Sequence, residues 1–305
     1  EAVLADRALH WAHLGQGKIW FRKQQYRQAG DLFTQLIDGH ARFMPAYDWL
    51  AKTQMAEQSF AAAMQTLKRA VQLSPRHLPR QQRLGELALK QGDSQLAETA
   101  FTQAVRLARH SVLNHPALYA GLAKSKSANQ KHQEALKALG DLRKSCVAHR
   151  EAAFYEASAL AVVQQDRGDA RGALAALRAA EQAITELGSL PPLLGLEMLS
   201  TCTRLDDIEK ARILLQQIIA NHHDDHELLV DVRHVCEATP LAQEADRRIH
   251  TTQQDIIQIN NTGVRLIQQG EVEAAIEWLH QANDEMPGNK TIMLNAAKAW
   301  IIKME

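Results

Sequence analysis

Apolar residues recur at helical spacing along the chain, in runs that are separated by short polar turns. In residues 83–107, RLGELALKQGDSQLAETAFTQAVRL, apolar positions follow one another every three or four residues on both sides of a central Gly-Asp pair. This spacing places the apolar side chains on one face of each helix, and glycine tolerates the positive φ that ends a helix. The stretch therefore predicts two amphipathic helices joined by a tight turn.

The same unit recurs through the chain. Gly17, Ala51 and Gly85 are 34 residues apart, and three further columns of residues keep this period over the same three copies. A column of alanines marks eight copies: Ala29, Ala63, Ala97, Ala135, Ala173, Ala211, Ala245 and Ala275. Three steps in this column are 38 residues long and the last is 30. One helical hairpin cannot bury its apolar faces alone, so the copies are expected to stack.

The turns carry a second signal. Gly-Asp or Gly-Glu pairs stand between the two halves of several copies, at residues 92–93, 168–169 and 270–271. An acidic residue after the glycine suits the N-terminus of the next helix, where backbone N–H groups lack partners. These pairs predict the points at which each hairpin reverses.

These offsets resemble the tetratricopeptide repeat. Leu84, Gly85, Ala97, Phe101 and Ala104 match its pattern, as does a later copy that ends at residue 287. The resemblance implies an all-α, right-handed superhelical solenoid of antiparallel helix pairs, with about eight hairpins and a C-terminal capping helix. A single solenoid over residues 1–305 is expected to hold repeats near 10–43, 44–77, 78–111, 116–149, 154–187, 192–225, 226–255 and 256–289, with the cap at 290–305.

Composition and charge narrow the class of protein. The chain has 305 residues, with 5% aromatic and 23% charged residues, and no apolar run approaches the roughly 20 residues of a membrane span. Cys146, Cys202 and Cys236 are far apart, which predicts buried, reduced thiols in a cytoplasmic protein that has no membrane contact. Residues 1–150 carry 22 Lys and Arg against 11 Asp and Glu, whereas residues 151–305 carry 13 against 24.

We find no motif for catalysis. GxSxG, HExxH and phosphate-loop patterns are absent, so the sequence predicts no enzyme, no catalytic residue and no cofactor. The run NHHDDH at residues 221–226 has side chains that can ligate a metal, but its place between two predicted helices favours a solvated loop. We therefore expect no metal site.

The resemblance also implies where a partner would bind. In tetratricopeptide solenoids the first helix of each pair lines the concave face, and fixed positions of that helix contact the partner. At one of these positions, three of the first four repeats have a lysine. These lysines predict binding of an acidic or carboxylate-bearing peptide. The alternative is that they are ordinary solvated lysines on a helix face. The groove candidates are Lys18, Arg22, Asp48, Lys52, Gln82, Glu86, Lys90, Lys124, Tyr155, His234 and Asn260.

Several functions stay open. Residues 259–301 resemble the C-terminal block of bacterial response regulators in which tetratricopeptide repeats follow a receiver domain. Since the chain opens on Glu1 rather than Met, we expect such a domain upstream and favour an effector role in two-component signalling. A free-standing scaffold or co-chaperone of envelope or secretion assembly is the first alternative. Nucleic-acid binding by the basic half is the second and is disfavoured, because aromatics are scarce between Lys124 and Arg150. Head-to-tail pairing of the basic and acidic halves in a homodimer is also possible.

Overall fold

The computed structural model describes residues 2–109, 111–188, 190–222, 225–285 and 290–304. These ranges contain sixteen α-helices and no strand, which confirms the expected all-α fold of helical hairpins. The chain forms two compact units, Glu1–Pro191 and Pro192–Glu305.

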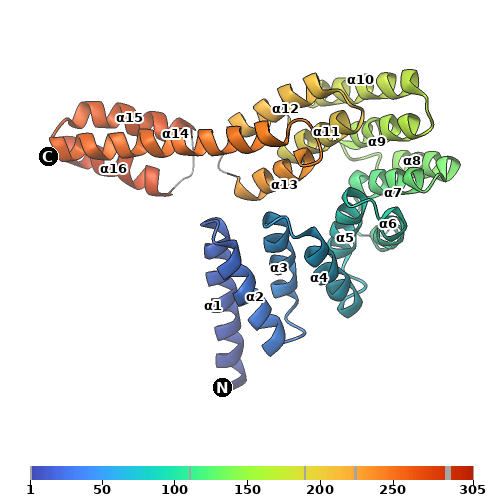
Figure 1. Cartoon of the computed structure of the whole chain (residues 1–305), viewed down its shortest axis with the longest axis horizontal. Helices are drawn as coiled ribbons and strands as arrows, with labels where there is room; N and C mark the ends of the chain where they lie inside the picture. Colours follow the sequence, from blue (N-terminus) through green and yellow to red (C-terminus); the bar gives the residue numbers. More distant parts are fainter. Residues whose placement is uncertain (1, 110, 189, 223–224, 286–289, 305) are drawn as a thin grey trace. The chain divides into compact units, whose positions relative to one another are not determined.

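The first unit is a stack of five helical hairpins (Figure 1). Each helix packs on the next in the chain, and first helices of successive hairpins also touch, as α1 does α3 and α7 does α9. The first helices therefore lie side by side along one side of the stack. The unit contains α1 (Ala2–Arg22), α2 (Tyr26–Gly39), α3 (Met44–Ala56), α4 (Phe60–Leu73), α5 (Leu78–Lys90), α6 (Ser94–Ala108), α7 (Pro116–Ala128), α8 (His132–Ser145), α9 (Ala152–Asp166) and α10 (Ala170–Leu187).

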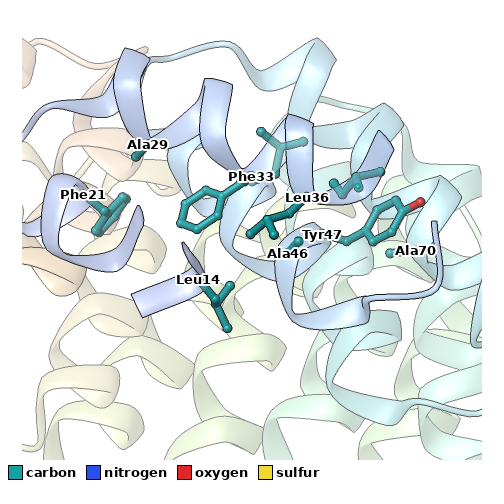
Figure 2. Close-up of a cluster of buried hydrophobic side chains, with 10 residues drawn as sticks. Leu14, Phe21, Ala29, Phe33, Leu36, Ala46, Tyr47 and Ala70 are labelled. Atoms are coloured by element: carbon teal, nitrogen blue, oxygen red, sulfur yellow. The ribbon is translucent and has the colours of Figure 1, made fainter. Parts of the chain in front are cut away.

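In hairpins that follow the repeat pattern, a large side chain of the second helix packs against a small residue of the first helix. Phe33 of α2 lies among Leu14, Leu36 and Tyr47 in the core of the first two hairpins (Figure 2). Its ring fills the space that a side chain at Gly17 would need, since a Cβ placed there would lie 2.4 Å from the ring. The 34-residue period therefore reflects a packing contact that recurs, in which a large side chain of the second helix (the knob) fills the space beside a small residue of the first helix (the socket).

The turns inside the hairpins reuse one backbone conformation. Gly92, Gly168 and Gly270 have positive φ angles of 76°, 80° and 83°, which confirms the predicted reversals. The equivalent turn position in other copies holds residues with side chains, also at positive φ: Gln24, Gln58, Gln130 and Asp206. A residue with a Cβ is strained in this left-handed region, so the period places strain at four of these turns.

Acidic residues after these turns cap the helices that follow. The Asp93 carboxylate accepts a hydrogen bond from the Leu96 backbone N–H at 3.1 Å, and Asp169 accepts one from Gly172 at 2.9 Å. Each cap satisfies a backbone donor that has no partner within the helix. The predicted helix starts at these two turns are therefore confirmed.

The second unit departs from the expected repeat boundaries. Residues 242–269 form one continuous helix, so the expected break between 255 and 256 is wrong (Figure 1). The sequence of this helix has no proline, and its one internal glycine, Gly263, packs against Leu279, so nothing breaks the helix before Gly270. The unit contains α11 (Pro192–Arg204), α12 (Ile208–Asn221), α13 (His226–Cys236), α14 (Ala242–Gln269), α15 (Val272–Glu285) and α16 (Lys290–Met304).

Two further expectations can be compared with the structure. Cys146, Cys202 and Cys236 are buried thiols in no disulfide, as predicted, and burial raises the pKa of Cys146. In the described part of the chain, no helix combines the length and the apolar character that crossing a bilayer requires.

Candidate protein-binding face

Two of the predicted groove lysines meet on one tryptophan. The ammonium group of Lys18 on α1 lies 5.1 Å from the centroid of the Trp49 ring, and that of Lys52 on α3 lies 4.5 Å from it. Cations at these distances are attracted by the negative face of an indole ring. The lysine ladder expected from the sequence is therefore organised around an aromatic side chain at α1 and α3.

The core beneath holds the tryptophan in place. The Trp49 ring meets the buried Phe21 ring nearly edge-on, with centroids 5.5 Å apart, and lies 6.3 Å from the Phe33 ring. Trp49 itself is half-buried, as are Lys18 and Lys52. Because the ring is packed on one side, its two flanking cations are held in a fixed relation to each other. Arg22, one turn after Lys18 on α1, is exposed and adds a third positive charge to this helix.

Asp48 has a structural role rather than an open place in the groove. Its carboxylate accepts two hydrogen bonds from the guanidinium of Arg80, each 2.8 Å long. Arg80 is buried on α5 and also donates to the Ser74 hydroxyl. A two-point ion pair of this kind fixes α5 on α3 and leaves Asp48 engaged.

The next first helices, α5 and α7, carry four of the predicted polar residues. The Gln82 amide donates to the Glu86 carboxylate one turn later on α5, at 2.8 Å. Lys90 lies exposed on the same helix, and Lys124 is half-buried on α7. These four residues lie on first helices as expected, but the contacts described do not join them to Trp49.

Tyr155 belongs to the core rather than to a binding surface. It is buried on α9, where its ring lies 5.4 Å from the His115 ring and 5.3 Å from the Phe154 ring. His115 caps the N-terminus of α7: its Nδ1 accepts a hydrogen bond from the Ala117 N–H, and its Nε2 lies 3.4 Å from Glu151. Burial lowers the pKa of His115, against the opposing attraction of Glu151.

The last two predicted residues lie in the second unit. His234 is half-buried on α13, and Asn260 on α14 accepts a hydrogen bond from the Asn295 amide of α16 at 3.0 Å. Asn260 therefore ties two helices of its own unit together.

A hollow that was not predicted from the sequence lies over the second helices α4 and α6. It has a volume of about 960 Å³, and its lining includes Gln72 and Glu98. Burial of Glu98 opposes its ionisation, but hydrogen bonds from Lys131, Asn129 and Lys126 outweigh that effect and lower its pKa. Residues that meet across 28 to 33 positions of sequence leave no local pattern, so this network had no sequence signal.

The described residues gather no metal site. In these ranges no three His, Cys, Asp or Glu side chains come together as metal ligands would. Within the run at 221–226, residues 223 and 224 lie outside the described part of the chain, and Asp225 caps α13 by accepting from the Leu228 N–H.

One serine lies near both a histidine and an aspartate. The Ser127 hydroxyl donates to Asp166 at 2.7 Å and lies 3.4 Å from His132 Nδ1. In a catalytic triad the histidine stands between the serine and the acid. Here the buried serine stands between the other two, so its proton is held by the carboxylate.

The family comparison matches two hairpins of the first unit, α3–α4 and α5–α6. Residues 45–77 and 79–111 each match the tetratricopeptide repeat model. Two of the chain's hairpins match tetratricopeptide repeats. The two matched repeats contain Trp49, Lys52 and the Asp48–Arg80 ion pair.

Solved structures of helical-repeat proteins resemble the chain at low identity. A tetratricopeptide repeat protein from Parabacteroides merdae is 10% identical, over 95% of this chain and 98% of that one, with a TM-score of 0.47. The type IV pilus biogenesis factor PilW is 14% identical, over 72% and 96% of the two chains, with a TM-score of 0.46. YrrB, described as having an unusual peptide-binding site, is 18% identical over 64% and 94%, with a TM-score of 0.36. No curated protein sequence matches significantly.

Proposed function

We propose that the protein is a protein-interaction module whose first unit binds an acidic polypeptide segment across α1 and α3. The observation that carries the proposal is the placement of the Lys18 and Lys52 ammonium groups against one indole ring. The partner's carboxylates pair with the two ammonium groups, and its apolar side chains pack on the exposed part of Trp49.

The charge of the first unit favours the same class of partner. Residues 1–191 contain 25 Lys and Arg against 17 Asp and Glu. An excess of positive charge attracts acidic segments at a distance and raises the rate of association, while the paired lysines set the register. No catalytic step is part of this function.

The test measures binding of a fluorescein-labelled peptide of alternating Glu and Leu by fluorescence anisotropy. Replacing both lysines, Lys18→Gln with Lys52→Gln, is expected to weaken binding about tenfold. The matched control, Lys137→Gln with Lys144→Gln, removes the same charge from exposed positions on α8 and is expected to change binding less than about twofold. Equal losses in the two double variants contradict the proposal, because net charge alone would then explain the binding.

A narrower role in signalling rests on the resemblance of residues 259–301 to the end of receiver-domain response regulators. In this role the repeats act in the cytoplasm as the output region, and phosphorylation of a receiver domain changes their access to the partner. The full-length gene product provides the test: treatment with acetyl phosphate is expected to change affinity for the acidic peptide. A gene that encodes a signal sequence or a lipid-attachment cysteine instead supports the envelope scaffold, and a salt-sensitive shift of random duplex DNA supports nucleic-acid binding.

A further inference from the structure

In repeats that follow the pattern, one position of the first helix, which forms a column through the repeats, holds a small residue, and the second helix of the same hairpin packs against it. A Cβ added at Gly85 would lie 2.8 Å from the Phe101 ring, and one added at Gly263 would lie 2.5 Å from Leu279. In both hairpins, therefore, a large side chain of the second helix lies directly on the small residue. The column identifies the face of any first helix that requires a covering helix.

Helix α16 has this face but no covering helix in the described part of the chain. It packs on α14 and α15, as a first helix packs on the preceding hairpin. Ala297 stands 34 residues after Gly263, in the same column, and it is exposed. The position that is covered in the preceding hairpin is therefore open on α16.

Large apolar side chains surround this open position. They lie at offsets from Ala297 that place them on one face of the helix, and Met304 is 84% exposed while Ile301 is 58% exposed. The stripe consists of Met293, Leu294, Ala297, Trp300, Ile301 and Met304. The outer face of a terminal helix in a repeat protein is normally polar, so this apolar stripe indicates an interaction surface.

Neighbouring contacts hold the largest side chain of the stripe in position. The Trp300 indole N–H donates to His280 Nε2 of α15 at 3.1 Å, and the Lys303 ammonium lies 5.6 Å from the Trp300 ring. A tryptophan fixed in this way loses little freedom on binding, which is the property of an interface anchor.

The pattern of the stripe selects its occupant. A small residue at the centre with large residues on both sides is complementary to itself when two such helices cross antiparallel, because each large side chain then meets the space beside a small one. The borders carry both signs of charge: Lys298 lies on α16 and Glu277 on α15, whereas Lys303 of α16 and Glu273 of α15 already pair at 3.7 Å within one copy. Two identical mixed borders can pair opposite charges.

We propose that a second copy of this chain covers α16, with the two α16 helices crossing antiparallel about a two-fold axis near Ala297. The contact is closed, because the same surface is used on both copies, so assembly stops at the dimer. This interface is independent of the acidic-peptide site on the first unit.

Analytical ultracentrifugation of the complete chain tests the interface. The unmodified protein is expected to dimerise, and Ile301→Glu is expected to weaken the dimer about 100-fold or more, because a dimer contains two copies of the change. The matched control is Ile213→Glu on α12, which is 55% exposed outside the stripe and is expected to leave the dimer intact. A monomeric unmodified chain, open-ended growth, or a dimer that Ile301→Glu does not weaken overturns the proposal.

A cysteine variant decides the case if Ile301→Glu loses helical circular dichroism. The native thiols are buried, so a cysteine introduced at the surface reacts with little background. Ala297→Cys lies near the proposed axis and is expected to form a dimer-sized, reducible band on mild oxidation, whereas Gln216→Cys, exposed on α12, is expected to form none. Absence of that band for Ala297→Cys also overturns the proposal.

Discussion

Helices α5 and α16 both have a small residue at the position where a second helix packs, but in the described chain only α5 has a second helix packed there. The Phe101 ring of α6 lies against Gly85 of α5 and also against Gly121 of α7, where an added Cβ would lie 2.3 Å from it. On α16 the matching residue, Ala297, faces outward beside exposed apolar side chains. The difference shows that the repeat period specifies a socket even where the described chain supplies nothing to fill it.

The largest expected effect comes from emptying the filled socket. Phe101→Ala is expected to lower the free energy of unfolding of the first unit by about 3–5 kcal/mol, because the cavity lies between two glycines that have no side chain to fill it. Met293→Ala on the open helix is expected to change stability by less than about 0.5 kcal/mol in dilute, monomeric protein. Urea denaturation followed by circular dichroism measures both, and a similar loss in the two variants would contradict the comparison.

An intermediate effect concerns the polar contacts beside the covered socket. Glu98→Gln is expected to cost about 1–2 kcal/mol at neutral pH, because it removes the charged acceptor shared by Lys131, Lys126 and Asn129. The folded-state pKa of Glu98 is lowered, so its contribution is present above the unfolded-state pKa and is lost as pH falls through the folded-state value.

The pH dependence supplies the measurement for this prediction. Thermal melts between neutral pH and about pH 3 are expected to show a smaller acid-induced loss of stability in Glu98→Gln than in the unmodified chain. Glu273→Gln is the matched control from the open hairpin, because Glu273 is exposed and lies 3.7 Å from Lys303. An unchanged acid limb in Glu98→Gln would remove this network from the account of stability.

The smallest effect separates two versions of the hairpin turn. Gln58→Gly is expected to stabilise the first unit by up to about 1 kcal/mol, because Gln58 has a positive φ of 60°. Gly92→Ala, at the matching turn between α5 and α6, is expected to destabilise it by about 1 kcal/mol. The melting temperatures of the two variants should therefore move in opposite directions; a shift in the same direction would show that contacts, not backbone strain, dominate.

Local periodicity predicted the hairpins well because it depends on residues close in sequence. The turns at Gly92 and Gly168 and the socket at Gly85 were all readable as spacing. The boundary within α14 was not, because a repeat register says where a copy should start but not whether the backbone must break there. In the absence of a helix breaker, the two halves fused.

The candidate site was predicted only in part, for a related reason. Helix register correctly placed Lys18 and Lys52 on neighbouring first helices, but it did not show that both contact Trp49. The signal available was an aromatic residue three positions before Lys52. The pairing of Asp48 with Arg80 and the burial of Tyr155 depend on contacts between hairpins, which a single sequence does not specify.

The unbroken α14 has a mechanical consequence for the second unit. Its 28 residues form a rod about 42 Å long that contacts α12 and α13 as well as α15 and α16. Because the helix is unbroken between the α12–α13 pair and the α15–α16 pair, a rotation of one pair is transmitted to the other. Truncation at residue 255 would divide α14 near its middle and remove part of the helix against which each pair packs.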